Sequence, residues 1–155
     1  MELELLAKNR EAIPIIASWY YEEWGHLSKE NTLAKITDTL HDYVNMDKIP
    51  LIVLTIDKGQ ILGASQLKYR EMDIYPEKEH WLGGVYVSKN HCGKGITKII
   101  IRRAISIATE FGVRKLYLQT ERLNGGPYKY LGWQPIELVN YRGVDVLVME
   151  KEICV

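Results

Sequence analysis

The sequence predicts a single α/β domain that spans residues 1–155. Its length of 155 residues is about that of one domain. Hydrophobic residues make up 46% of the chain and charged residues 26%, a composition typical of a globular protein with a packed core. Helical and strand patterns alternate along the chain, with turn signals between them and no repeat. We therefore expect one mixed domain of helices and strands.

The first third of the chain predicts a short strand over 2–7 and two amphipathic helices. The first helix, over 13–24, carries apolar residues at helical spacing, with Pro14 in its first turn and Gly25 as a stop signal. A similar apolar spacing over 33–44 predicts the second helix. Each helix is expected to bury one face against the rest of the domain.

The middle of the chain predicts strands that are separated by a tight turn and a polar loop. Apolar and β-branched runs bounded by turn residues are typical of β-hairpins. The third of these strands contains the pair Gly83-Gly84, which marks a β-bulge or a close approach of another segment to the backbone. The predicted elements are strands over 51–56, 61–69 and 81–87, a turn at 57–60 and a loop over 70–79.

The last third predicts a long helix, a strand, a short helical segment and a closing hairpin. One face of the long helix is apolar and the opposite face is polar. Its buried stripe is expected to consist of Ile100, Ala104, Ile107, Ala108 and Phe111. The predicted elements are a helix over 96–111, a strand over 115–120, a short helix over 126–131 and hairpin strands over 134–141 and 144–150.

Charge and hydropathy exclude several classes of partner. Lysine plus arginine and aspartate plus glutamate each number 20, so no net field favours nucleic acid or an anionic membrane surface. Apolar runs fall far short of the ~20 residues that a membrane span needs. The acidic start of the chain lacks the features of a signal peptide. We expect a soluble cytoplasmic protein without a nucleic-acid or membrane partner.

The cysteine and histidine residues show no metal-ligand spacing. Cys92 and Cys154 form at most one pair, which does not make a disulfide framework. His26, His41 and His91 are isolated along the chain and are expected on the surface. We therefore predict no metal site.

A glycine-containing turn joins the strand Val85-Tyr86-Val87 to the helix that begins near Ile96. Gly93-Lys94-Gly95 stands directly before this helix. Glycines at such a turn let backbone N–H groups converge on an anion, and the helix dipole adds partial positive charge. The turn suits a pyrophosphate, with Lys94 and Lys98 as electrostatic support. The alternative is a tight connection that needs glycine only for its backbone angles.

Two common nucleotide-binding motifs do not match this turn. A P-loop requires serine or threonine after Gly-Lys, but Gly95 follows Lys94. The dinucleotide fingerprint requires a third glycine where the chain has Lys98, and too little chain follows for a catalytic domain. A P-loop enzyme and a Rossmann oxidoreductase are therefore disfavoured.

The turn resembles the signature of the GNAT superfamily of acetyl-coenzyme A dependent N-acetyltransferases. In that family a strand of the form hydrophobic-Tyr-Val precedes the segment Gln/Arg-x-x-Gly-x-Gly/Ala. In this sequence the strand Val85-Tyr86-Val87 precedes Cys92-Gly93-Lys94-Gly95-Ile96-Thr97, which stands in the place of that segment. Tyr128-Lys129-Tyr130-Leu131-Gly132-Trp133 is similar to a second family motif, Tyr-x-x-Leu-Gly-Phe/Trp. The resemblance implies a mixed, mostly antiparallel sheet of six or seven strands with about four flanking helices. The sheet would be splayed between the strands at 81–87 and 115–120.

The resemblance also implies an activity. An acetyl group would move from acetyl-coenzyme A to a primary amine of a small molecule or peptide, by direct attack of the amine in a ternary complex. Backbone groups of the splayed strand would pair with the pantetheine arm of the coenzyme, and the glycine turn would bind its pyrophosphate. The implied coenzyme-binding residues are Val85, Tyr86, Val87, Cys92, Gly93, Lys94, Gly95, Ile96, Thr97, Lys98 and Asn124. For Asn124, the alternative is a local role in turning the chain.

Two positions depart from the family pattern. Cys92 stands where the family has glutamine or arginine, and Thr97 stands where it has a second small residue. Cys92 keeps a backbone N–H but loses a cationic side chain, and Thr97 adds bulk where the helix approaches the coenzyme. These departures favour an alternative function, a catalytically weak acyl-coenzyme A binding module of the same fold.

By the same resemblance, Tyr128 is the catalytic acid that protonates the departing thiolate, since a phenol with a reference pKa of ~10 is protonated at neutral pH. The alternative is a tyrosine that packs beside Trp133. Candidates for the base that deprotonates the amine are Glu79, His80 and Glu121, each of which has a purely solvated or structural alternative.

The acceptor amine is expected at the end of the first helix. Glu22, Glu23 and Trp24 combine acidic and aromatic groups that suit a cationic amine. For Trp24, the alternative is packing in the core. A homodimer is compatible with this interpretation.

Overall fold

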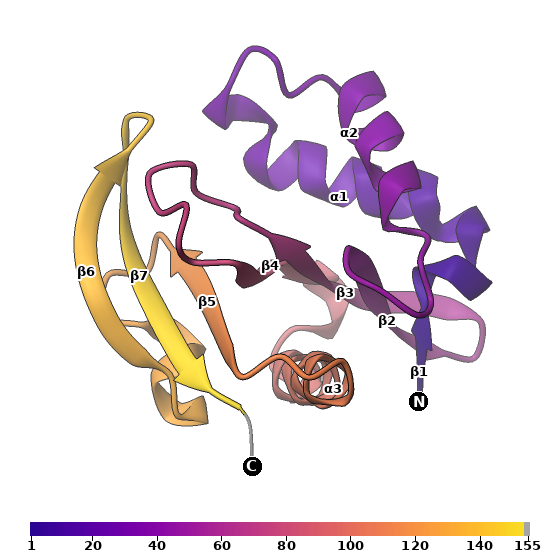
Figure 1. Cartoon of the computed structure of the whole chain (residues 1–155). Coiled ribbons are helices and arrows are strands. Elements are labelled where there is room, and N and C mark those ends of the chain that lie inside the picture. The colour runs from indigo at the N-terminus through magenta and orange to yellow at the C-terminus, as the bar shows by residue number, and fades with distance from the viewer. Residues whose placement is uncertain (154–155) are drawn as a thin grey trace.

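The computed structural model describes residues 1–153 and contains one mixed sheet with helices on both faces (Figure 1). Cys154, and with it the prediction on a Cys92–Cys154 pair, lies outside these residues. Within the described part of the chain, the sheet has seven strands in the order β1-β2-β3-β4-β5-β7-β6, and all neighbouring pairs are antiparallel except β4–β5. The strands are β1 Glu2–Leu5, β2 Leu51–Asp57, β3 Gln60–Tyr69, β4 His80–Val87, β5 Lys115–Thr120, β6 Gln134–Tyr141 and β7 Val144–Glu152. The predicted fold class is confirmed.

Helices α1 (Ile13–Trp24) and α2 (Leu33–Leu40) cover one face of the sheet, and α3 (Ile96–Glu110) covers the other (Figure 1). Pro14 lies in the first turn of α1 and Gly25 follows its last residue, as the sequence predicts. The prediction that the second helix extends to Val44 was wrong, because α2 gives way to a 3₁₀ turn, and Val44 instead forms a β-bridge with Leu51. The first strand is also shorter than predicted, since a 3₁₀ turn begins at Leu6.

The buried stripe of α3 differs from the prediction at one end. Ile100, Ala104, Ile107 and Ala108 are buried as expected. Phe111 is 37% exposed, because α3 ends at Glu110 and the backbone of Phe111 caps the last turn. The fully buried Ile101 contributes to the core in its place.

The pair Gly83-Gly84 forms the predicted bulge in β4. Ala64 pairs with Tyr86 but Gln66 pairs with Gly83, so β4 has one extra residue opposite β3. A Cβ atom on Gly84 (φ +53°) would lie 2.7 Å from both the Gln66 side chain and the Tyr20 hydroxyl. A Cβ atom on Gly83 would lie 2.8 Å from a carboxylate oxygen of Glu71. Gly84 requires glycine because of both its backbone angle and these contacts, whereas at Gly83 the Glu71 carboxylate occupies the space that a side chain would take.

Strands β4 and β5 separate after a single register pair among residues 1–153, that of Trp81 with Tyr117. Trp81 is the second residue of β4, so most of β4 has no hydrogen-bonded partner strand on the side of β5. The resulting splay lies in the middle of the sheet (Figure 1). None of the helices in the described part of the chain is long and apolar enough to span a membrane.

Candidate active site

The glycine turn forms an exposed cradle at the start of α3. Gly93 (φ +81°) and Gly95 (φ +75°) adopt backbone angles that favour glycine, and a Cβ atom on either would meet nothing within 4 Å. The first N–H groups of α3 follow Gly95 and have no carbonyl partner within the helix. Lys94 and Lys98 are exposed beside them. The turn therefore has the space, the donors and the charge to bind an anion.

The thiol of Cys92 stabilises the loop before this turn. It contacts the backbone oxygens of Ser88 at 3.5 Å and Val87 at 3.8 Å. These contacts are local, and the backbone of Cys92 remains exposed at the turn. The Cys92 side chain thus stabilises the conformation of the loop. It cannot make the charged contact that an arginine at this position of the motif would make.

A cavity of about 390 Å³ connects the glycine turn to the 3₁₀ segment Gly126–Leu131. It brings together the two motifs that the sequence places far apart. The lining residues are Val87, His91, Gly93, Gly95, Ile96, Thr97, Lys98, Pro127, Tyr130 and Leu131. Six of the predicted coenzyme-binding residues are among them, including Thr97, which is half-buried.

His91 is at the surface as predicted, but it is more covered than the sequence suggests. His91 lines this cavity and is half-buried, whereas His26 and His41 are exposed as expected. Its Nδ1 atom is buried and has no hydrogen-bond partner among residues 1–153. Sequence spacing did not reveal this placement because it results from the 3₁₀ turn Lys89–His91.

Tyr128 lies on the other side of the splay from β4. Its ring packs edge-on against Trp133, with ring centroids 6.2 Å apart. Burial, together with the nearby charge of Glu71, raises the pKa of Tyr128 to about 12, although Arg122 acts in the opposite direction. The phenol is therefore protonated throughout the physiological pH range. Tyr128 is not among the residues that line the 390 Å³ cavity, which is bounded instead by its neighbours Pro127 and Tyr130.

The sequence matches the family model of the acetyltransferase (GNAT) family over residues 11–129. The chain belongs to the GNAT family. Among curated proteins, none matches the sequence.

Solved structures share the GNAT fold of this chain at low sequence identity. An aminoglycoside 6'-N-acetyltransferase complexed with coenzyme A has a TM-score of 0.75 at 13% identity, over 99% of this chain and 97% of that one. A ribosomal-protein-alanine N-acetyltransferase from Brucella melitensis has a TM-score of 0.75 at 18% identity, over 98% and 99%. A spermidine N-acetyltransferase from Vibrio cholerae has a TM-score of 0.69 at 17% identity, over 98% and 95%.

In this GNAT domain the C-terminal half of α1 lies over the C-terminal end of β4. The ring of Trp19 stacks on Tyr86 with centroids 5.1 Å apart, and Trp24 meets Tyr86 edge-on at 6.4 Å. Trp24 is half-buried in this cluster, which agrees with the alternative that it packs in the core. Glu22 and Glu23 are exposed, and their charges add to the effect of burial in raising the pKa of Tyr86. Both carboxylates are thus close enough to β4 to influence a charged group that binds beside Tyr86.

The Asn124 side chain has a local partner. Its Oδ1 atom accepts a hydrogen bond from the Gly126 N–H at 3.0 Å, which is the turn-forming role considered for this residue. The amide nitrogen is on an exposed side chain. A contact of Asn124 with a coenzyme remains a prediction.

Of the candidate bases, Glu79 and Glu121 are exposed and His80 is half-buried against Tyr69, and a different carboxylate lies at the bulge. Glu79 is ion-paired with Arg70 at 2.9 Å, and Glu121 lies on the exposed loop after β5. Glu71, which the sequence analysis did not single out, is adjacent to Gly83 and has only 16% of its side chain exposed. The signal that points to it is Gly83, whose missing side chain makes room for a neighbouring group.

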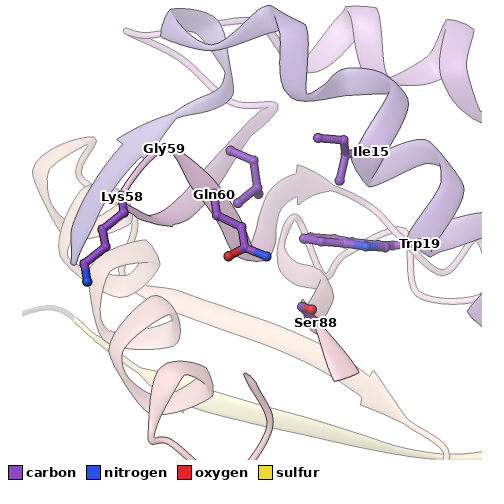
Figure 2. Close-up of a pocket in the computed structure, with 7 residues that line it drawn as sticks. Ile15, Trp19, Lys58, Gly59, Gln60 and Ser88 are labelled. Carbon is purple, nitrogen blue, oxygen red and sulfur yellow. The ribbon is translucent and has the colours of Figure 1, made fainter. Parts of the chain in front are cut away.

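A second hollow of about 500 Å³ lies between α1 and the β2–β3 turn (Figure 2). Its lining residues are Ile15, Trp19, Lys58, Gly59, Gln60, Ile61 and Ser88. None of the predicted site residues is among them, so the candidate active site is assigned to the splay and the cavity beside the glycine turn. In the described residues 1–153, no group of three or more metal-ligand side chains comes together.

Proposed function

We propose that this GNAT protein transfers the acetyl group of acetyl-coenzyme A to a primary amine of a small molecule or peptide. The observation that carries the proposal is the parallel pair β4–β5, which is joined at Trp81–Tyr117 and then separates toward the glycine turn. This splay leaves a strand edge for the coenzyme arm, with an anion cradle at one end and a protonated phenol beside it.

The residues present fit the coenzyme. Gly93 and Gly95 leave open space above the first N–H groups of α3, which suits a pyrophosphate. The free edge of β4 at Val85 and Val87 offers backbone groups to the amide-containing pantetheine arm. Lys94 and Lys98 add positive charge near the phosphates. When bound, the coenzyme supplies an acetyl group that is activated as a thioester.

The chemistry needs a proton at the departing sulfur. The lone pair of the amine nitrogen forms the new N–C bond while the C–S bond breaks, and the electron pair of that bond leaves on sulfur. Tyr128 donates its hydroxyl proton to this thiolate, and the amine nitrogen loses a proton to solvent. A backbone N–H near Tyr86 polarises the carbonyl oxygen under attack. Burial keeps Tyr128 protonated, so its hydroxyl is available as a hydrogen-bond and proton donor when negative charge develops on the sulfur, and solvent returns the proton to the phenol afterwards.

An amine acceptor is supported by the surroundings of β4 and by the proteins of similar fold. Glu22 and Glu23 are exposed near Tyr86, and they favour a cationic group. The structural neighbours described above are named for acetylation of aminoglycosides, of a ribosomal-protein alanine and of spermidine. In all three names the acetylated group is an amine.

The proposed function is tested by calorimetric titration with acetyl-coenzyme A, followed by a thiol-release assay over a panel of primary alkylamines and peptides. Saturable coenzyme binding and amine-dependent thiol release support the proposal. Tight coenzyme binding without release on any amine favours the binding-module alternative, to which the substitutions at Cys92 and Thr97 point. Failure to bind the coenzyme contradicts both.

A further inference from the structure

Glu71 is a largely buried carboxylate that lies against the bulge of β4. Its Oε1 atom is 3.4 Å from the Lys68 ammonium, and both side chains are mostly covered, with 16% and 24% exposed. A Cβ atom on Gly83 would lie 2.8 Å from the same oxygen. The carboxylate therefore sits directly above the strand that borders the splay.

The loop that carries Glu71 is held firmly in place. Met72, the next residue, is fully buried against Trp81 and the core beneath β7. Asp73 accepts hydrogen bonds from Arg142 at 2.9 Å and from the Tyr141 hydroxyl at 3.1 Å. The β3–β4 loop is thus fastened to the β6–β7 hairpin across the splay. Because these contacts follow Glu71 immediately, the carboxylate has a defined position.

Glu71 has unused capacity to bind a cation. An ionised carboxylate offers about four acceptor positions, and within residues 1–153 Lys68 is its one partner. Lys68 also interacts with Tyr43, so its charge is shared. Burial would lower the pKa of Lys68, but Glu71 and Tyr43 raise it above its ordinary value, which keeps Lys68 charged beside the carboxylate. A buried carboxylate with free lone pairs favours a second positive partner.

Glu71 also lies near the proposed proton donor. Its charge contributes to the raised pKa of Tyr128, so the carboxylate acts electrostatically on the phenol. The glycine turn opens α3, whereas Lys68, the ion-pair partner of Glu71, interacts with Tyr43 of the core cluster that packs against α1.

We propose that Glu71 is the group that binds the ammonium of the acceptor, so that the protein selects cationic alkylamines and places their nitrogen beside the Gly83-Gly84 bulge. Lys68 orients the carboxylate, and Asp73 positions the loop. This inference deepens the proposed function and rests on it. The role of Glu71 is electrostatic, because a carboxylate is too weak a base to deprotonate an alkylammonium ion efficiently.

The test measures steady-state kinetics of the parent protein, Glu71→Gln and Glu77→Gln on the best alkylamine of the panel. Glu77 is the matched control, since it is an exposed carboxylate in the same loop. In Glu71→Gln the KM for the amine is expected to rise roughly 10- to 100-fold, with kcat and the KM for acetyl-coenzyme A changed far less. Glu77→Gln is expected to behave as the parent.

Glu71→Gln leaves Lys68 buried without its partner, which can destabilise the fold. The double variant Lys68→Met/Glu71→Gln removes both charges, and thermal melting reports whether each variant is folded. A folded variant without Glu71 whose amine KM equals that of the parent overturns the inference while the proposed function stands. A parent protein that binds acetyl-coenzyme A but acetylates none of the amines overturns both.

Discussion

Trp81 and Tyr117 form the register pair that joins the parallel strands β4 and β5, and their rings pack with centroids 5.6 Å apart. Trp81 is fully buried, and its indole N–H donates to the Lys78 carbonyl at 2.7 Å. The closed end of the splay is therefore fixed by an aromatic contact, whereas the open end leads to the glycine turn. The account of coenzyme binding depends on this asymmetry.

Acetyl-coenzyme A is expected to raise the melting temperature of the protein. A ligand at about 100 times its Kd stabilises the native state by about 2.7 kcal/mol, which for a domain of this size corresponds to a shift of roughly 5–10 °C. Differential scanning fluorimetry with saturating coenzyme measures the shift. An unchanged melting temperature at saturation would count against a coenzyme site in the splay.

Gly95→Glu is expected to abolish coenzyme binding. A side chain at this position has open space but must adopt a φ of +75°, and glutamate adds negative charge where the pyrophosphate would bind. Gly95→Ala is the matched control, because it carries the same backbone strain without the charge. Calorimetric affinities of the two variants should differ by more than tenfold. Equal affinities would show that the pyrophosphate does not bind at this turn.

Gly84→Ala is expected to destabilise the domain. The added Cβ would lie 2.7 Å from the Gln66 side chain and the Tyr20 hydroxyl, which donates a hydrogen bond to the Gly84 carbonyl. Gly59→Ala is the control, since Gly59 has a similarly positive φ but no atom within 4 Å of the added Cβ. Gly84→Ala should cost about 1–3 kcal/mol more than the control in chemical unfolding. Equal losses would show that backbone angle alone requires the glycine.

The pH dependence of turnover follows from the pKa of Tyr128. The pKa of about 12 means that the phenol remains a proton donor while an alkylamine acceptor, with an ordinary pKa of ~10, becomes deprotonated. Turnover should therefore rise with pH and show no descending limb up to about pH 10. A descending limb between pH 8 and 10 in the parent that Tyr128→Phe lacks would contradict the raised pKa.

Much of the fold followed from local sequence signals. Helix α1 could be bounded from Pro14 and Gly25, and the bulge from Gly83-Gly84. The errors occurred where a tertiary contact overrides local spacing. Val44 continues a helical apolar pattern but pairs with β2, and Phe111 lies beyond the last helical turn.

The site could be predicted only where its residues form a contiguous motif. The glycine turn and the 128–133 segment have such motifs, and the structure brings them to one cavity. Glu71 lies in a polar loop whose composition suggests solvation, and its burial comes from the contacts of Met72 and Asp73 with the β6–β7 hairpin. His91 reaches the cavity through a 3₁₀ turn. These placements depend on contacts between distant segments, and the hydrophobic periodicity of the sequence gives no information on such contacts.

The central claim is that the protein transfers an acetyl group at the splay between β4 and β5, with Tyr128 as the proton donor. The most direct test compares the parent protein and Tyr128→Phe in thiol release from acetyl-coenzyme A with a verified amine acceptor, together with coenzyme affinity by calorimetry. The account predicts that turnover falls roughly 10²-fold or more while affinity changes little. Equal turnover in the two proteins would contradict it.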